Sequence, residues 1–359
     1  MQNIYDLTYE ELKNQIISWG FPAYRTDQVW ERLYDKYWHL PDQFSALPKA
    51  FRSQLSTYFS KPEAAGSLSQ LQPEQTIQSP DGETIKTLFS LVDHRAIEAV
   101  LMRYEKRRTL CISTQAGCAM GCVFCATGQM GFRRHLTSGE IVEQVLHYAR
   151  QLAEKSEQVT NIVFMGMGEP FHNYDETMAA IDRLNYPQGY NFGARRMTIS
   201  TVGIIPGLNR FTKEHRQINL AVSLHAADEE LRSKLLPINR KYPLRDLFPA
   251  CVNYVKETHR RISFEWALIQ EVNDTLEQAR LLADRLKVFK LGDSMLCHVN
   301  VIRLNPTLKY AKQATTRQRV DAFVAELTKH GVPCTIRLRR GIDIQAGCGQ
   351  LWQRHETLS

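Results

Sequence analysis

The chain has 359 residues, of which 43% are hydrophobic and 23% are charged, and its 45 Lys and Arg outnumber its 38 Asp and Glu to give a formal net charge of +7. This length and balance exclude a mostly disordered chain and suit one large α/β domain with a smaller accessory unit. No segment approaches the roughly 18 apolar residues that a membrane-spanning helix needs, and the N-terminus lacks the pattern of a secretion signal, so we expect a cytoplasmic protein without a membrane partner.

Residues 1–60 are predicted to form a small helical accessory domain. Thr8 and Glu11 have the spacing of a capping box, in which each residue satisfies a free backbone amide at the start of a helix. Three apolar stripes with helical spacing follow, and Gly and Pro residues separate them.

Residues 61–103 are predicted to connect this domain to the main one. Residues 61–80 are rich in Pro, Ser, Gln and Glu and show no periodicity, which is typical of a linker or an irregular connection. The β-rich runs 87–92 and 96–102 are separated by a short polar break and are expected to pair as a hairpin.

Residues 104–343 are predicted to be the core domain, and residues 344–359 a C-terminal segment. Six or more alternations of short β-branched runs with amphipathic helices predict an α/β fold with a parallel sheet that is closed or partly closed as a (β/α) TIM-type barrel. In such a fold the chemistry lies at the carboxyl ends of the strands. The expected strands are 109–112, 161–165, 197–200, 218–223, 262–268, 299–304 and 335–338, and the expected helices include 138–152, 176–184, 244–257, 275–286 and 316–330.

Cys118, Cys122 and Cys125 form a C-x3-C-x2-C loop directly after the first core strand. Three thiolates can bind three irons of a [4Fe-4S] cluster and leave the fourth iron open. The amino and carboxylate groups of S-adenosylmethionine (SAM) can chelate that iron, and one electron then cleaves the cofactor to a 5′-deoxyadenosyl radical. The loop therefore indicates radical SAM chemistry.

A structural zinc site is the alternative interpretation of the same loop, and it needs a fourth Cys or His in a nearby pair. No C-x2-C or H-x3-H pair follows the loop, and Cys111 and Cys348 lie outside it. The remaining cysteines lie in apolar helix or strand settings and are expected to be buried structural thiols: Cys251, Cys297 and Cys334.

Four short basic runs lie beside the segments that carry these motifs. Any single run is adequately explained as the solvated end of a helix or strand, but four of them together favour contacts with RNA phosphates. The runs are 106–108, 133–135, 195–196 and 337–340.

From about residue 96 to 352 the chain resembles the RlmN and Cfr rRNA adenine methyltransferases of the radical SAM superfamily, through CISTQAGCAMGCVFCATGQMGF, FMGMGEP, TISTVGIIP, NLAVSLHA, LLPINRKYPL, VNVIRLNP and RGIDIQAGCGQL. The resemblance implies a partial β/α barrel, one [4Fe-4S] cluster held by the three loop cysteines, and two SAM molecules per turnover. The implied SAM contacts are Gly168, Glu169, Ser200, Ser223, Leu224, His225 and Asn305. Considered alone, the glutamate is equally a helix-entry carboxylate, the serines strand-end caps and the histidine a hydrogen-bonded core residue.

The resemblance also implies a covalent mechanism. Cys348 corresponds to the cysteine that the family methylates on sulfur, and Cys111 to the resolving cysteine that forms a transient disulfide with it. Glu98 corresponds to the proton acceptor, with a solvent-facing strand carboxylate as the alternative. Gly347 departs from the Ala that the family usually has before the methylated cysteine.

The resemblance thus implies an SAM-dependent methyltransferase that modifies a ring carbon of an adenine in 23S rRNA, with C2 as the expected position and tRNA as a second candidate substrate. The helical domain of residues 1–60 is expected to help to hold this RNA. Because a ring carbon is accessible only in an unstacked nucleotide, the rRNA is expected to react before ribosome assembly. A reducing protein is expected as electron donor. The alternatives are C8 methylation that confers antibiotic resistance, a radical SAM maturase of another substrate, and a zinc-dependent RNA-binding module.

Overall fold

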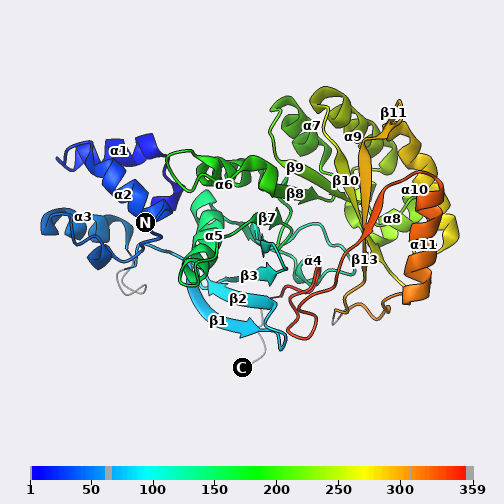
Figure 1. The fold of residues 1–359 in the computed structure, drawn as a ribbon, viewed down its shortest axis with the longest axis horizontal. Coiled ribbons are helices and arrows are strands. Elements are labelled where there is room, and N and C mark those ends of the chain that lie inside the picture. The colour runs from blue at the N-terminus through cyan, green and yellow to red at the C-terminus, as the bar shows by residue number, and fades with distance from the viewer. Residues whose placement is uncertain (1, 61–66, 308, 353–359) are drawn as a thin grey trace.

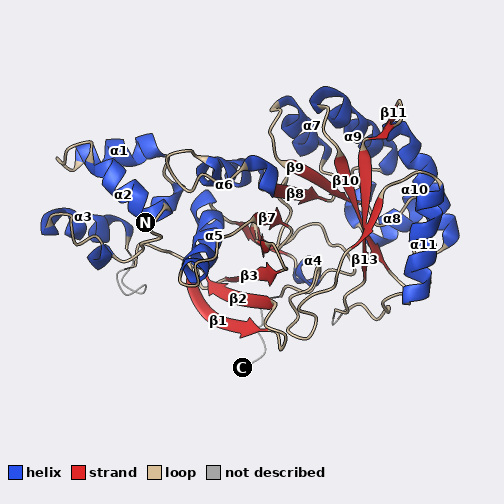
Figure 2. Cartoon of the chain, in the orientation of Figure 1, coloured by secondary structure: helices blue, strands red, loops and turns tan. Residues whose placement is uncertain are grey.

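The computed structural model describes residues 2–60, 67–307 and 309–352. Its centre is one ten-stranded sheet (Figures 1 and 2). In spatial order its strands are β1 (Gln72–Gln78), β2 (Thr84–Ser90), β3 (Ala96–Arg103), β4 (Arg108–Cys111), β7 (Asn161–Phe164), β8 (Met197–Thr201), β9 (Asn219–Ser223), β10 (Ile262–Leu268), β13 (Cys297–Arg303) and β14 (Cys334–Ile336).

The strands from β4 to β14 pair in parallel, whereas β1, β2, β3 and β4 pair in antiparallel fashion. Helices connect the parallel strands, as a β/α barrel requires. They are α4 (Ala126–Met130), α5 (Ser138–Ala153), α6 (Tyr174–Asn185), α7 (Ile205–Lys213), α8 (Glu229–Leu235), α9 (Leu244–Thr258), α10 (Leu276–Leu286) and α11 (Arg317–Lys329). The predicted α/β partial barrel is confirmed.

The barrel does not close on itself, because β4 pairs with β3 and not with β14. The segment 337–352 bridges this seam from the last strand toward β2 (Figure 1). Arg340 forms an ion pair with Glu83, at 3.1 Å between Nη1 and Oε2. The ammonium of Lys86 donates to the carbonyl oxygen of Gln345 at 3.3 Å. Side-chain contacts therefore close the seam.

Buried apolar side chains explain why the core strands and helices pack together. Trp266 in β10 is fully buried, and its ring lies 5.6 Å from that of Phe323 in α11. Capping boxes begin two of the helices: Thr8 exchanges hydrogen bonds with Glu11, as predicted, and Thr137 does so with Glu140 at the start of α5. No helix in the described ranges is long and apolar enough to cross a bilayer.

The expectation of an irregular linker over residues 61–80 is wrong for residues 72–78, which form β1. This strand pairs with β2 and has a register shift between Pro73 and Gln75. Its side chains are mostly exposed and polar, so the apolar alternation that marks a strand is missing. Residues 61–66 lie outside the described residues. The predicted hairpin is confirmed as β2 and β3.

Smaller elements complete the fold, and most of them were not predicted. α7 and α8 are short helices of 9 and 7 residues, and a proline interrupts the pattern at the start of α7. The small sheets contain β5 (Gln115–Gly117) with β6 (Phe132–His135), and β11 (Lys290–Leu291) with β12 (Ser294–Met295). The N-terminal helices, which were predicted, are α1 (Tyr9–Ser18), α2 (Arg25–Tyr34) and α3 (Lys49–Phe59).

A buried carboxylate joins the N-terminal segment to the core. Glu143 of α5 is 3% exposed and accepts hydrogen bonds from the side chains of Asn3 and Ser69 and from the backbone amides of Gln70 and Leu71. Burial raises the pKa of Glu143 to about 7, although the hydrogen bonds oppose this shift. Ionisation of this carboxylate therefore works against folding near neutral pH.

We expect Glu143→Gln to remove one component of the pH dependence of stability. A carboxyl group with a folded pKa of about 7 and an unfolded pKa near 4.5 contributes stability that is complete below the lower value and is lost as the pH rises through the higher one. Relative to the variant, the free energy of unfolding of the wild type should fall by on the order of 3 kcal/mol as the pH rises from the unfolded pKa to above the folded pKa. Urea unfolding at several pH values measures this difference.

Glu157→Gln is the matched control, because ion pairs with arginines lower the pKa of Glu157 to about 2. The stability that Glu157 contributes is lost only on acidification, so its difference curve from the wild type should be flat between pH 5 and 8. Parallel stability curves for the wild type and Glu143→Gln would show that Glu143 does not titrate in this range.

Candidate functional site

A cavity opens at the carboxyl ends of the parallel strands, where a β/α barrel places its chemistry. The structure brings most of the predicted site residues to its wall, from loops that follow different strands. They are Cys118, Cys122, Cys125, Gly168, Glu169, Ser200, Ser223, His225, Asn305 and Cys348. Leu224 is fully buried and does not line this cavity, and its backbone amide donates to the carbonyl of Glu265 at 3.1 Å.

Backbone hydrogen bonds fix the shape of the cysteine loop. The amide of Cys118 donates to the carbonyl of Gly131 at 3.0 Å, and the amide of Cys125 donates to the carbonyl of Cys122 at 3.1 Å. Burial raises the pKa of Cys118 to about 12 and that of Cys122 well above its ordinary value, and neighbouring thiols raise both further. A positive metal centre is what would compensate three thiolates in such a place.

The geometry of the loop suits a cluster better than a single ion. Within the described residues, no three His, Cys, Asp or Glu side chains converge closely enough to hold one metal ion. A [4Fe-4S] cluster takes each thiolate on a different iron, so its ligands are spaced more widely than those of a zinc ion. The three cysteines around one cavity fit such a cluster, whereas the described residues offer no closely spaced ligand set for a single zinc ion.

Gly168 and Glu169 follow β7 and enter the cavity in a constrained turn. Gly168 has a φ of +108°, and an added Cβ would lie 2.7 Å from Gln115, so only glycine fits. The carboxylate of Glu169 accepts hydrogen bonds from the amides of Phe171 and Val202, at 3.0 and 2.8 Å. Burial raises the pKa of Glu169 to about 7. An ammonium group beside it would favour the charged form.

Side chains at the carboxyl ends of β8 and β9, together with His225, form the next part of the wall. The hydroxyl oxygens of Ser200 and Ser223 lie 3.4 Å apart. Nδ1 of His225 accepts a hydrogen bond from the amide of Ala267 at 2.9 Å, which leaves Nε2 as the protonated nitrogen of the neutral ring. Burial lowers the pKa of His225 to about 3, so the ring stays neutral. His225 is thus both a hydrogen-bonded core residue and part of the cavity wall.

Asn305 ties the C-terminal segment to the end of β13. Its Nδ2 donates to the carbonyl of Cys348 at 3.0 Å, and its Oδ1 accepts from Nε of Arg339 at 2.9 Å. An added Cβ on Gly347 would lie 2.7 Å from the same amide nitrogen and 2.8 Å from Oε1 of Gln350. The glycine therefore permits the close packing that holds Cys348 in its present place.

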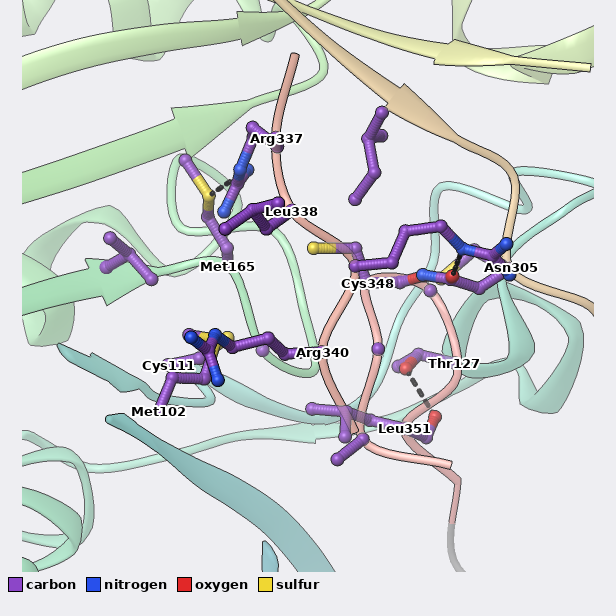
Figure 3. Close-up of a pocket in the computed structure, with 18 of the residues that line it drawn as sticks. Met102, Cys111, Thr127, Met165, Asn305, Arg337, Leu338, Arg340, Cys348 and Leu351 are labelled. Carbon is purple, nitrogen blue, oxygen red and sulfur yellow. Dashed lines mark hydrogen bonds between the residues drawn. The ribbon is translucent and has the colours of Figure 1, made fainter. Parts of the chain in front are cut away.

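A second cavity adjoins the first, and Cys348 lines both of them. Cys111 of β4 lines this second cavity, and Figure 3 shows the Cys348 side chain directed toward the part that Met165, Arg337 and Leu338 border. Both cysteines are free thiols, with Cys111 buried and Cys348 exposed. Burial raises the pKa of Cys111 to about 12, and the cation of Arg337 opposes that shift.

Sequence reasoning missed a polar pair, Arg337 and Glu265, in the wall of the first cavity. Arg337 donates from Nη1 to Oε2 of Glu265 at 3.1 Å, and Asn300 donates to the other carboxylate oxygen at 2.8 Å. The sulfur of Cys348, followed by the carboxylate of Glu265, holds the pKa of Arg337 above its usual range. A carboxylate within the apolar strand run FEWAL is the one signal that pointed to this pair.

Glu98 lies in β3 and is 3% exposed, so the interpretation as a solvent-facing strand carboxylate is wrong. Its Oε1 pairs with the ammonium of Lys86 at 2.7 Å, and its Oε2 accepts from the amide of Trp352 at 2.8 Å. Glu98 does not line the cavity that contains Cys111 and Cys348. In this conformation, the carboxylate anchors the C-terminal segment.

Several arginines of the predicted basic runs are neutralised within the protein. Arg108 pairs with Glu157, and Arg134 pairs with both Asp93 and Glu140. In the last run, Arg337 and Arg340 also pair with carboxylates. These ion pairs weaken the expectation that whole runs contact RNA phosphates. Of the other three cysteines, Cys251 and Cys297 are buried as predicted, and Cys334 is half-buried.

Comparisons with known proteins agree with this site. Residues 112–283 match the radical SAM superfamily. The crystal structure of a radical SAM methyltransferase from Sphaerobacter thermophilus matches with a TM-score of 0.92 and 46% sequence identity, over 98% of this chain and 99% of that one. The fold and the cysteine loop define a radical SAM protein, a class that uses a [4Fe-4S] cluster and SAM.

Curated relatives show to which family of radical SAM proteins the chain belongs. A probable dual-specificity RNA methyltransferase RlmN of Chloroflexus aurantiacus is 46% identical over 99% of this chain and 93% of its own length. The dual-specificity RNA methyltransferase RlmN 1 of Myxococcus xanthus is 47% identical over 97% of this chain and 94% of its own length. The ribosomal RNA large subunit methyltransferase N of Nitrosopumilus maritimus is 42% identical over 98% of both chains. The chain belongs to the RlmN family, as its motifs predicted.

Proposed function

We propose that this protein methylates C2 of an adenine in 23S rRNA, and a tRNA adenine as a second substrate, through an S-methylated Cys348. One observation carries the proposal: Cys348 lines both the cavity with the three loop cysteines and the cavity with Cys111. A single sulfur can therefore face a methyl donor on one side and a resolving thiol on the other. The names of the RlmN relatives support RNA as the substrate.

The residues of the first cavity bind the cofactor and accept the methyl group. SAM bound at the reduced cluster, two molecules per turnover, supplies the methyl group and the radical that activates it. Glu169 binds the cofactor ammonium, and Ser200, Ser223, His225 and Asn305 line its pocket. The thiolate of Cys348 accepts the methyl carbon, which later bonds to the adenine ring.

Release of the product needs a base and a second thiol. We assign the removal of the ring proton to Glu98, which requires the Trp352 segment to move away from its carboxylate. The thiolate of Cys111 then attacks the sulfur of Cys348, so that a disulfide forms and the carbon–sulfur bond breaks. The electron pair of that bond stays with the carbon on the ring, which takes up a proton and becomes the methyl group. A reducing protein of the cytoplasm returns the disulfide to two thiols and also supplies the electron for the cluster.

Mass spectrometry of RNA tests the proposal directly. Transcribed 23S rRNA, assembled ribosomes and tRNA are each incubated with SAM, a reductant and the enzyme, and the modified nucleoside is identified. We expect 2-methyladenosine in free 23S rRNA and in tRNA, with none in the assembled ribosome. Exclusive 8-methyladenosine would place the enzyme with the alternative C8 activity, and unmodified RNA beside a modified protein would favour a maturase.

We expect Glu98→Gln to stop turnover after the carbon–carbon bond has formed. The amide keeps an oxygen for the amide of Trp352 but cannot accept a proton, and loss of a general base lowers rates by about 10²- to 10⁴-fold. A covalent protein–RNA adduct that keeps the ring proton should accumulate on denaturing gels, with deuterated adenine as the label. Lys86→Met is the control for the lost ion pair. Normal turnover by Glu98→Gln would assign the base elsewhere.

A further inference from the structure

A third hollow lies at the opposite mouth of the barrel, at the amino ends of the strands. Its charged residues come from the turns before β4, β8 and β10 and from the start of β13. We call it the amino-end basin and define it by six side chains: Arg107, Arg195, His259, Arg260, Arg261 and His298. Two of the predicted basic runs thus contribute one arginine each to a single surface.

Neutral groups contact three of the four arginines of the amino-end basin. Arg195 and Arg260 both donate to Oε1 of Gln217, at 3.4 and 3.0 Å, and Arg260 also donates to Oδ1 of Asn219 at 3.0 Å. Arg107 lies over the ring of Tyr104, 5.1 Å from its centroid. Neutral acceptors and a ring orient these guanidinium groups without cancelling their charge.

The contrast with other arginines of the protein is clear. Arg103, Arg108, Arg134, Arg216 and Arg340 each pair with a carboxylate. Within the described part of the chain, none of the four arginines of the amino-end basin forms such an ion pair. Arginines that are held in place and left unpaired are suited to an anionic ligand.

The interior of the basin is also polar. Among its described lining residues the one carboxylate is Glu265, and Arg337 and Asn300 already bind it. Thr198 and Ser263 line the hollow where closed barrels have layers of apolar side chains. The hollow is therefore a solvated, positively charged space and not a gap in the packed core.

We propose that the amino-end basin binds phosphate groups of the RNA substrate, as a second contact at the mouth of the barrel opposite the one that holds Cys348. The walls of the two spaces meet at Met165, Glu265 and Arg337. This inference rests on the proposed function, because that function makes a long polyanion the substrate. β10 spans 7 residues, about 23 Å of strand, and a folded RNA is several times longer than this. One RNA can therefore present a base to the carboxyl-end cavity and backbone phosphates to the other mouth.

The test compares two triple variants that remove equal charge. The basin variant lacks three arginines of the amino-end basin and carries Arg195→Gln, Arg260→Gln and Arg261→Gln. The control variant lacks three arginines that pair with carboxylates elsewhere and carries Arg210→Gln, Arg280→Gln and Arg317→Gln. A labelled transcript of 23S rRNA is the probe, and its dissociation constant is measured by fluorescence anisotropy over a series of potassium chloride concentrations. The absorbance of the cluster verifies that each variant is folded.

We expect the basin variant to lower the slope of log affinity against log salt by about two units, since each lost phosphate contact accounts for about 0.7 on single-stranded RNA, and to weaken binding at low salt by about ten-fold or more. The control variant should change both quantities much less, because its arginines are already neutralised. If the triple variant does not fold, Arg107→Gln and Arg261→Gln, both at exposed positions, should each lower the slope by about 0.7.

Equal slopes and affinities for the wild type and the basin variant would overturn the proposal. Unchanged RNA affinity combined with slower reduction of the cluster by its protein donor would also overturn it, in favour of an acidic protein as the ligand. The proposed function fails separately: if no RNA is methylated but the slope still falls in the basin variant, the binding site remains and the reaction is wrong.

Discussion

Cys348→Ala should abolish RNA methylation, by on the order of 10³-fold or more, because it removes the atom proposed to carry the methyl group. The cluster should be unaffected, since its three ligands lie in a separate loop that backbone hydrogen bonds hold. With SAM labelled in its methyl group, the wild-type protein should retain label on Cys348 and the variant should retain none. Peptide mass spectrometry after proteolysis locates the label.

Cys111→Ala is the matched comparison, because both cysteines line the same cavity but have different proposed roles. Without the resolving thiol, the methyl carbon should still transfer to RNA, and a covalent protein–RNA adduct should accumulate. Cys348→Ala should form no adduct. Identical behaviour of the two variants, or methylated RNA from Cys348→Ala, would contradict the division of labour between the two sulfurs.

Cys122→Ala should remove the cluster and with it both the visible absorbance of the protein and all RNA methylation. The three thiols line one cavity, and two remaining ligands cannot hold a cluster that leaves a single iron open. Iron and sulfide analysis of anaerobically purified protein measures the loss. The far-ultraviolet circular dichroism should be retained, because Cys122 lies between β5 and α4, outside the strands and helices that give this signal.

Cys334→Ala serves as the control, because Cys334 is a half-buried free thiol at the start of β14 and does not line the cluster cavity. Its iron content should equal that of the wild type. If Cys122→Ala retained a full complement of iron and sulfide, the assignment of the cluster to this loop would be wrong, and so would the radical chemistry that depends on it.

Local patterns predicted the parallel half of the fold well, because its strands are buried runs of β-branched and apolar residues. β10 was predicted at its observed bounds, Ile262–Leu268, and nearly every residue in it is buried. β1 was missed for the opposite reason: as a polar edge strand it depends on pairing with β2 and has no apolar face. α7 and α8 were missed because 9 and 7 residues give too short a periodic signal.

The candidate site was predictable where chemistry fixes the spacing along the chain. Three cysteines within eight residues indicate a cluster without knowledge of the fold. Glu265 and Arg337, in contrast, are 72 residues apart and meet only because β10, β13 and β14 lie side by side in parallel register. The roles assigned to Cys348, Cys111 and Glu98 stay predictions until the variants are measured.

The open seam of the barrel places the proposed methyl carrier outside the strand-to-strand loops. In a closed barrel every reactive group is carried by a loop between two fixed strands. Here Cys348, the proposed methyl carrier, belongs to the segment 337–352. Side-chain contacts hold this segment to β3, to β2 and to Glu83 just before β2. Movement of this segment breaks no strand pairing of the sheet, because none of its residues belongs to a strand. The open seam therefore offers a route by which the sulfur of Cys348 moves between the cavity of the loop cysteines and the cavity of Cys111.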